Sequence, residues 1–204
     1  MPRGKAATFE LQRASILQAA AELFAARGFV SASMAELAEV CGVSKPLLYH
    51  YYRDKEQILF DVADTYLDGL LAIVADIESK RLPPLDHFRS LLRRFMQEYE
   101  HAQAYHSVLV QDVKFLNAVE RKRIVAKENR VVDAFADAVA ALKPRLRKKS
   151  LRVPLAMVLF GMINWTFTWL RPDGALSYDD MSEVIADVFL WGVCDRDPSA
   201  AARA

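Results

Sequence analysis

Residues 31–60 read SASMAELAEVCGVSKPLLYHYYRDKEQILF, and this stretch decides the fold of the chain. Ser33 can accept hydrogen bonds from the free backbone N–H groups at the start of a helix, and Glu36 follows three residues later to complete a capping box. Gly42 supplies the permissive backbone that a sharp helix exit requires. Because Ser44 is a second N-cap, the pattern predicts two short helices joined by a tight turn.

A further helix is expected to follow this pair, capped by Asp54. The second helix of the pair, at residues 44–51, directs Leu48 and Tyr52 inward and leaves polar and aromatic side chains exposed. In a helix–turn–helix, the N-terminal part of this second helix meets base edges in the major groove, while flanking groups hold phosphates. Spacing alone is a weak signal, because a surface helix in an ordinary bundle can carry a similar tyrosine-rich patch.

Residues around this segment carry a resemblance to a known family. They are Arg13-Ala-Ser-Ile-Leu-Gln-Ala-Ala, Leu23-Phe24, Arg27-Gly28-Phe29, Ser33-Met34, Leu37-Ala38, Cys41-Gly42-Val43-Ser44-Lys45, Leu48-Tyr49, Tyr52 and Asp54-Lys55-Glu56. Together they resemble the DNA-binding domain of the TetR family of bacterial repressors. The resemblance implies an all-α homodimer with a three-helix DNA-binding domain at residues 1–55. A six-helix ligand-binding and dimerisation domain would follow at residues 56–204.

The resemblance also implies which residues meet the operator. Those expected on or next to the recognition helix are Ser44, Lys45, Pro46, Leu47, Tyr49, His50 and Tyr51. Ser33 and Lys55 are expected to hold phosphates from the two neighbouring helix N-termini. Tyr51 stands where many relatives have His.

Composition and charge fit this architecture. The chain has 204 residues, of which 53% are apolar and only 7 are Gly and 8 Pro, which favours long helices over a turn-rich β fold. Residues 1–55 carry seven Lys and Arg against five Asp and Glu, a local charge of only +2. DNA binding must therefore rely on the placement of a few cations and on two copies per operator. A two-fold dimer predicts a palindromic operator, with half-sites about 34–36 Å apart.

The helices expected outside the central pair cover residues 8–26, 54–80, 85–101, 104–114, 118–142, 151–170 and 177–193.

The last two of these helices carry more apolar surface than one subunit can bury. Residues 153–170 lack charge and are long enough to be considered as a membrane span. A helix buried at a dimer interface is the preferred interpretation, because the resemblance implies a four-helix bundle with the partner subunit. A cytoplasmic protein without membrane contact is therefore expected. The expected interface residues are Leu159, Ile163, Val184, Val188 and Trp191.

The effector is inferred from a shorter resemblance. Residues 160–174 resemble the C-terminal domain of TetR-type repressors that respond to acyl-CoA thioesters, and the N-terminal segments resemble phenylacetyl-CoA-responsive members. Residues 114–149 carry eleven Lys and Arg against four acidic residues, a local +7, and CoA phosphates attract such cations. The candidate ligand-binding residues are Phe95, Tyr99, Phe115, Arg121, Arg123, Phe135 and Trp165. Taken singly, each is more simply a core aromatic or a solvated cation.

Asn164 is a polar residue within an apolar helix and must find a hydrogen-bond partner if it is buried. A partner across the dimer is favoured over one in the ligand. Two other functions stay open: a TetR-type repressor of an efflux or stress operon that senses a hydrophobic molecule, and a helical lipid or CoA carrier without DNA function. No cofactor, metal site or enzymatic activity is expected, because the sequence lacks HExxH, GxSxG and P-loop patterns.

Overall fold

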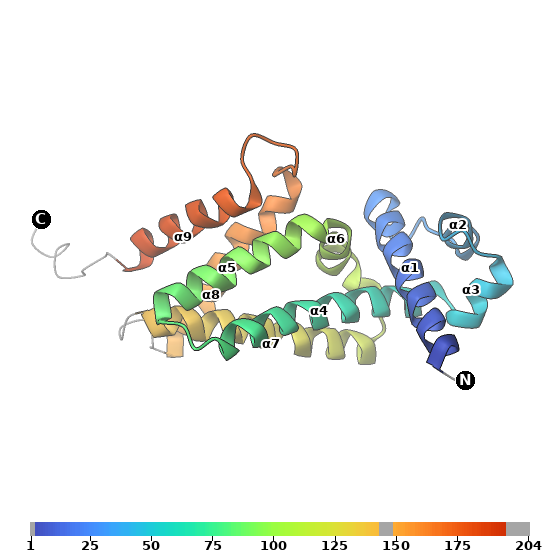
Figure 1. Cartoon of the computed structure of the whole chain (residues 1–204), viewed down its shortest axis with the longest axis horizontal. Helices are drawn as coiled ribbons and strands as arrows, with labels where there is room; N and C mark the ends of the chain where they lie inside the picture. Colours follow the sequence, from blue (N-terminus) through green and yellow to red (C-terminus); the bar gives the residue numbers. More distant parts are fainter. Residues whose placement is uncertain (1–2, 143–148, 195–204) are drawn as a thin grey trace, which may run out of the picture. The chain divides into compact units, whose positions relative to one another are not determined.

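The computed structural model describes residues 3–142 and 149–194, and the regular structure of these ranges is helical. Figure 1 labels the α-helices: α1 Arg3–Arg27, α2 Met34–Val40, α3 Lys45–Tyr51, α4 Lys55–Ser79, α5 Pro84–His101, α6 Gln103–Asp112, α7 Ala118–Leu142, α8 Lys149–Asn164 and α9 Tyr178–Cys194. Two single-turn 3-10 helices, η1 Val113–Phe115 and η3 Trp165–Thr168, follow α6 and α8. The predicted all-α fold is confirmed.

The described residues form two compact units. The first contains the chain up to Gly69 together with Ala102–Lys127, and the second contains Leu70–His101 together with the described residues from Glu128 onward. Helices α4 and α7 therefore each contribute residues to both units. The predicted division into residues 1–55 and 56–204 separates a DNA-binding part from a ligand-binding part, whereas these two units are defined by how the residues pack. We retain the predicted division as a proposal.

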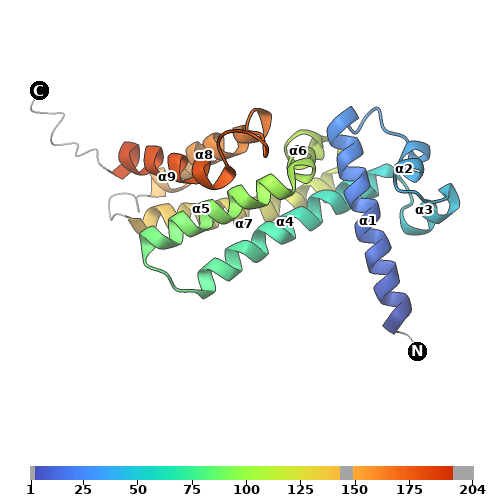
Figure 2. The same ribbon diagram turned by 45° about the horizontal axis from the view of Figure 1, so that its top comes forward.

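In the first unit, α1 packs against α2 and α6, and α2 packs against α3, as Figures 1 and 2 both show. Ile16, Ala20 and Phe24 repeat at intervals of four and are almost fully buried, which makes one stripe of α1 part of the core. The helix ends at Arg27, and the next residue, Gly28, has a φ of +80° that few other residues tolerate and donates its N–H to the Phe24 carbonyl at 2.8 Å. It begins at Arg3, five residues earlier than the sequence predicts.

The core of the second unit is a cluster of edge-to-face aromatic rings. The Phe135 ring of α7 lies 4.7 Å from that of Phe95 in α5 and 4.9 Å from that of Phe160 in α8, measured between centroids. Tyr99 extends the cluster along α5. Because Phe95 and Phe135 have no exposed surface, these aromatics provide much of the buried apolar area that holds α5, α7 and α8 together.

Helix α8 is shorter than predicted, because α-helical geometry stops at Asn164 and a 3-10 turn replaces the last part. The Thr166 hydroxyl donates to the Ile163 carbonyl at 2.6 Å, and the Thr168 hydroxyl donates to the Trp165 carbonyl at 2.7 Å. Such local side-chain bonds compete with the helical hydrogen-bond pattern. The following helix, α9, begins one residue after Ser177, which forms reciprocal cap bonds with Asp180.

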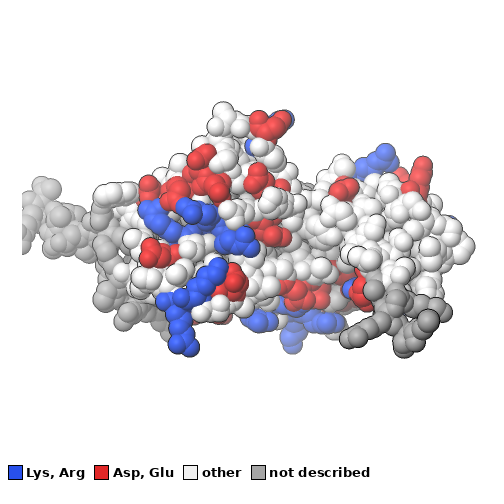
Figure 3. All heavy atoms as spheres, viewed as in Figure 1, with Lys and Arg blue, Asp and Glu red and all other residues white. Residues whose placement is uncertain are grey.

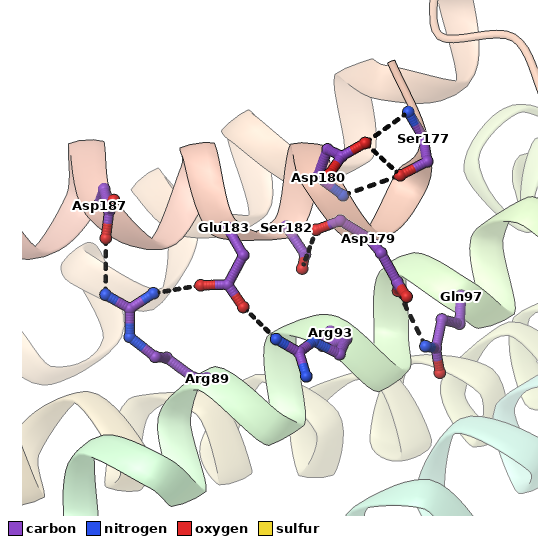
Figure 4. Close-up of polar contacts among 9 residues, drawn as sticks. All are labelled: Arg89, Arg93, Gln97, Ser177, Asp179, Asp180, Ser182, Glu183 and Asp187. Carbon is purple, nitrogen blue, oxygen red and sulfur yellow. Dashed lines mark hydrogen bonds and ion pairs between the residues drawn. The ribbon is translucent and has the colours of Figure 1, made fainter. Parts of the chain in front are cut away.

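Ion pairs fix α9 against α5 (Figure 4). Arg89 of α5 donates to Asp187 at 2.6 Å and also to Glu183, which in turn accepts from Arg93. The hydrogen bond to Asp187 raises the pKa of Arg89. On the face in Figure 3, the described basic side chains lie beside acidic ones, as expected where such pairs bridge helices. The α5–α9 pairing in turn sets which face of α9 is exposed.

Replacing Arg89 by Ala should lower the free energy of unfolding by about 1 kcal/mol, because the side chain is partly exposed and solvent weakens its two ion pairs. The loss should shrink as salt is raised. Urea unfolding at low and high salt measures both effects. Arg94→Ala on the same helix is the matched control, because Arg94 is exposed and bonds only weakly to Gln97, at 3.2 Å. Equal losses of unfolding free energy in Arg89→Ala and Arg94→Ala would contradict a stabilising role for the ion pairs between α5 and α9.

Candidate functional site

The N-terminus of α2 carries the predicted capping box. The Ser33 hydroxyl accepts a hydrogen bond from the Glu36 N–H at 3.3 Å, and the Glu36 carboxylate accepts from the Ser33 N–H at 3.0 Å. The bonds from Ser33, together with Arg27, lower the pKa of Glu36. The Ser33 hydroxyl also donates to Glu36, so it already has bonds within the protein. A phosphate contact by Ser33 stays a prediction and would have to share this hydroxyl.

The turn between α2 and α3 takes the form that the sequence predicts. Gly42 has a φ of +63°, and Val43 donates from its N–H to the Ala38 carbonyl at 3.0 Å. Ser44 then caps α3 by accepting from the Leu47 N–H at 3.3 Å. These local bonds set the angle at which the recognition helix leaves α2.

Two buried side chains anchor α3. Leu48 has no exposed surface, and Tyr52 at the C-terminal end of the helix is 2% exposed. The opposite face contains most of the predicted operator contacts, and its exposed members are Lys45, Pro46, Leu47, Tyr49 and His50. The inward and outward directions predicted for these side chains are confirmed, whereas their contact with DNA stays a prediction.

Tyr51 lies differently from its neighbours on α3. Its ring is half-buried and stacks on Phe9 of α1, with a centroid distance of 4.6 Å and an interplanar angle of 22°. A second link from α1 lies nearby, where Arg13 pairs with Asp61 of α4 at 2.6 Å. The operator contact of Tyr51 stays a prediction, and it would have to use the part of the side chain that Phe9 does not cover.

Lys55 also differs from its prediction. Its ammonium donates to the carbonyls of Phe29, Val30 and Ala32 at 3.0, 3.1 and 2.9 Å. An ammonium group has three N–H donors, and these three carbonyls use all of them. In this arrangement Lys55 binds the loop between α1 and α2, and its predicted phosphate contact stays a prediction that would require these bonds to be exchanged.

A surface groove of about 480 Å³ runs between α2, α3 and the start of α4. Its lining includes Lys45, Tyr49 and Arg53. The Arg53 side chain is 84% exposed and pairs with Asp54 at 2.8 Å. Our sequence-based site did not include Arg53, although its place between the recognition helix and the Asp54 cap could have identified it. The lining thus combines three cations, one of them Lys55, with the carboxylates of Asp54 and Glu56 and an exposed tyrosine.

The candidate effector residues fall into separate groups. Phe95, Tyr99 and Phe135 meet in the core of the second unit, as described above. The Tyr99 hydroxyl donates to the Asn164 side-chain oxygen at 2.8 Å. Asn164 therefore has a partner within its own chain, and the partner favoured from the sequence, one across the dimer, is not needed to satisfy this oxygen. Burial raises the pKa of Tyr99, so its hydroxyl stays a hydrogen-bond donor.

The other candidates do not belong to this cluster. Phe115 lies in the first unit and stacks on Phe29, with centroids 5.5 Å apart. Arg121 and Arg123 are exposed on the part of α7 in the first unit, where Arg123 lies over the Phe60 ring. Trp165 is 67% exposed, so it does not belong to the buried aromatic cluster, and its role in ligand binding stays a prediction.

The basic segment is less available to an anion than its net charge indicates. Lys127 contacts the carboxylates of Asp64 and Asp68, both at 2.6 Å, so its charge is offset within the protein. Residues 143–148, which hold four of the eleven cations, lie outside the described residues, as does the side chain of Lys149. The exposed cations of this segment that the structure describes are Lys114, Arg121, Lys122, Arg123 and Arg130.

An apolar surface runs along α8 and α9. On α9, Val184, Val188 and Trp191 are 46%, 59% and 69% exposed. Leu159 and Ile163 of α8, by contrast, have no exposed surface within the chain itself. Their assignment to a dimer interface is corrected, because a side chain buried in its own subunit has no area left for a partner. The exposed apolar residues of α8 are Leu151, Val153, Met157 and Val158.

The segment Ser150–Thr168 is, among the described residues, long and apolar enough to cross a membrane. Only 28% of this window is buried within the chain. Length and composition alone are weak evidence for a membrane span, because helices at protein interfaces can have the same properties. The exposure does mean that α8 has an apolar face without a partner in the single chain.

Comparison with known proteins identifies the family. Residues 16–62 match the family described as bacterial regulatory proteins, tetR family, and residues 81–193 match the tetracyclin repressor-like C-terminal domain. The crystal structure of a TetR-family transcriptional regulator from Bordetella parapertussis 12822 is 31% identical, with a TM-score of 0.85, over 90% of this chain and 96% of that one.

Two further relatives have a name or a title that states a regulatory role or a bound ligand. The HTH-type transcriptional repressor KstR2 of Mycolicibacterium smegmatis is 25% identical over 89% of this chain and 90% of its own. The structure of AibR in complex with isovaleryl coenzyme A and operator DNA is 24% identical, with a TM-score of 0.77, over 87% of this chain and 97% of AibR. On the two domain matches and the Bordetella structure, this chain belongs to the TetR family of ligand-responsive transcriptional regulators, which are DNA-binding proteins rather than enzymes.

Proposed function

We propose that the chain acts in the cytoplasm as a homodimer that binds a palindromic operator through α3 and is released by an acyl-CoA-type effector. The observation that carries the DNA-binding part is the outward face of α3. This face combines Lys45, Tyr49 and His50 on a helix that Leu48 and Tyr52 hold from beneath. A short helix anchored on one side with polar and aromatic groups on the other is suited to the major groove.

The groove beside α3 supports the same proposal. Lys45 and Arg53 line it and can meet phosphate oxygens on the strand next to the major groove, while Tyr49 lies between them in sequence. With a local charge of only +2 over residues 1–55, one subunit supplies few phosphate contacts. Two subunits on one operator double that number, which is why the proposal requires a dimer.

The exposed apolar face of α8 and α9 supports dimerisation. Val188 and Trp191 of α9 are 59% and 69% exposed, although Asp187 of the same helix pairs with α5. An exposed apolar face of this kind marks an interaction surface in a soluble protein. Packing α8 and α9 against the same helices of a second copy would cover it symmetrically. This arrangement keeps the four-helix bundle of our sequence analysis but replaces Leu159 and Ile163 by the exposed residues of α8.

An acyl-CoA effector is supported by three separate observations. AibR, which shares this fold at 24% identity, was solved with isovaleryl coenzyme A and operator DNA. In this chain, the core between α5, α7 and α8 contains an aromatic cluster and one amide, Asn164, which suits an acyl group with a polar end. In the first unit, and separately from this cluster, the exposed cations Arg121 and Arg123 can attract phosphates. A phenylacetyl or a branched short acyl group can pack on these rings once the cluster opens.

A hydrophobic effector without phosphates is the second candidate. It is favoured by the neutralisation of Lys127 by Asp64 and Asp68, which removes one cation from the basic segment. It needs only the aromatic cluster of Phe95, Phe135 and their neighbours, which can bind an apolar molecule once it repacks. A carrier without DNA function is not favoured, since it gives no role to the capped and outward-facing α3.

Tyr49→Ala should weaken operator binding by about tenfold or more, because a direct base contact contributes about 1–3 kcal/mol. Its melting temperature should stay close to that of the wild type, because the side chain is 47% exposed. Fluorescence anisotropy with a duplex enriched from a random library by the wild-type protein measures the affinity. Val119→Ala removes another exposed side chain, 73% accessible, and should leave binding unchanged. Wild-type affinity in Tyr49→Ala would contradict the placement of α3.

Val188→Asp should convert the dimer to a monomer at micromolar concentration, because an unpaired carboxylate at a buried interface costs several kcal/mol, roughly two or more decades of affinity. Sedimentation velocity of both proteins measures the assembly. Leu85→Asp is the matched control: Leu85 is 47% exposed on α5, and the substitution should leave the dimer intact. A wild-type monomer, or a dimer that survives Val188→Asp, would contradict this interface.

Isothermal titration should detect binding of isovaleryl-CoA or phenylacetyl-CoA and much weaker binding of the corresponding free acids. The double variant Arg121→Gln with Arg123→Gln should weaken thioester binding by about tenfold or more, because hydrogen bonds to charged groups contribute about 1.5–3 kcal/mol. Lys122→Gln removes a neighbouring charge and serves as the control. Binding of an uncharged hydrophobic dye without any thioester binding would favour the second candidate and overturn the first.

A further inference from the structure

The loop between α1 and α2 is held by a single side chain from α4. Residues 28–32 connect the two helices, and within this loop the carbonyls of Phe29, Val30 and Ala32 lie 3.0, 3.1 and 2.9 Å from the Lys55 ammonium nitrogen. Since the three N–H donors of the ammonium match three acceptors, Lys55 has no donor left for a phosphate in this arrangement.

Phe29 is the centre of the same contact. Its side chain is 4% exposed, and the Lys55 ammonium lies 4.6 Å from the ring centroid, a cation–π distance. Phe24 of α1 meets the ring edge-on at 5.3 Å, and Phe115 of η1 stacks on it at 5.5 Å. The Asp112 carboxylate, at the end of α6, accepts the Phe29 backbone N–H. Helices α1, α4 and α6 and the 3-10 turn η1 thus all meet at one loop residue.

This loop determines where the DNA-binding helices start. Ala32, whose carbonyl is one of the three acceptors, directly precedes Ser33, the N-cap of α2. Helix α2 packs against α3 through the Gly42 turn, so a displacement of residues 28–32 moves α2 and then the recognition helix. Lys55 can therefore influence DNA binding without touching DNA.

We propose that Lys55 is a positioning residue for operator binding, which fixes the α1–α2 loop through Phe29, and that it is not a phosphate ligand. The proposal rests on the DNA-binding role proposed above for α3. Phe115 stacks on the same ring, so it belongs to the same clamp, which we define as Lys55, Phe29, Asp112 and Phe115. Loss of either side of the clamp should release the loop.

Charge-conserving and charge-removing substitutions separate the two roles. Lys55→Arg keeps the positive charge, and an arginine binds phosphate at least as well as a lysine does. The guanidinium of arginine is planar and spreads its donors over three nitrogens. It therefore does not reproduce the three hydrogen bonds that one ammonium nitrogen makes to three carbonyls. A phosphate ligand should therefore tolerate Lys55→Arg, whereas a loop clamp should not. Lys55→Met removes both charge and donors.

The salt dependence of binding gives a second, independent criterion. The logarithm of the binding constant falls with the logarithm of salt concentration by about 0.9 for each phosphate contact, so a dimer that loses one contact per subunit changes its slope by about two. Lys45→Met removes an exposed cation that lines the groove and should show that change. Lys122→Met removes an exposed cation from α7 and is the control for general charge.

The experiment measures anisotropy of the duplex enriched by the wild-type dimer, over a range of salt concentrations, for wild type, Lys55→Met, Lys55→Arg, Phe115→Ala, Lys45→Met and Lys122→Met. The clamp predicts that both Lys55 variants and Phe115→Ala bind about tenfold more weakly or worse, with the slope of the wild type. Circular dichroism verifies that each variant is folded. Should Lys55→Met fail to fold, Lys55→Arg and Phe115→Ala carry the test.

Two results would overturn the proposal: Lys55→Arg with wild-type affinity, or Lys55→Met with a slope reduced by about two, as for a lost phosphate contact in each subunit. Wild-type affinity in Phe115→Ala would overturn the part of the proposal that concerns η1. Failure of the wild-type protein to enrich any duplex would instead count against the proposed function, and so the two failures are distinguishable.

Discussion

A recognition helix of seven residues cannot be stable in water by itself, and the first unit depends on the contacts that hold α3 in place. On one side of this helix, the Leu48 side chain is fully buried and the Tyr52 side chain is nearly fully buried. Its start is fixed by the Ser44 cap, and Tyr51 near its end stacks on Phe9. Because packing occupies one side of the helix, only the other side can meet DNA. The orientation of α3 is thus a consequence of core formation rather than of its own sequence.

The same principle applies to α2 and the loop before it. A capping box at Ser33 starts the helix, but a cap does not determine where the helix lies relative to α4. That position is fixed by the Lys55 ammonium on three loop carbonyls and by Phe29 between Phe24 and Phe115. In the second unit, the ion pairs of Arg89 with Glu183 and Asp187 fix α9 in a comparable way. Val184, Val188 and Trp191 of α9 stay exposed in the single chain.

Local signals in the sequence predicted much of this structure. The caps at Ser33, Ser44 and Asp54 act within four residues, and so their helices begin where the pattern indicates. Helix α7 has the predicted bounds, Ala118–Leu142. The inward side of α3 could be predicted because its apolar residues follow helical spacing.

Contacts between distant residues could not be predicted in this way. The resemblance implied a phosphate contact for Lys55, whereas its bonds to backbone carbonyls 23 to 26 residues away follow no sequence pattern. Leu159 and Ile163 looked like interface residues because α8 is apolar on all sides, so periodicity could not tell the inner face from the outer one. Phe115 and Phe135 are both aromatic residues of the predicted ligand set, yet they pack in different units.

The central claim is that two copies of α3 read one operator together. It is tested most directly by comparing the affinity of the wild-type protein for an enriched palindromic duplex with that for the same duplex carrying one scrambled half-site. The account predicts a loss of roughly two or more decades, since a single half-site forfeits half of the base and phosphate contacts. Equal affinity for the two duplexes would contradict it.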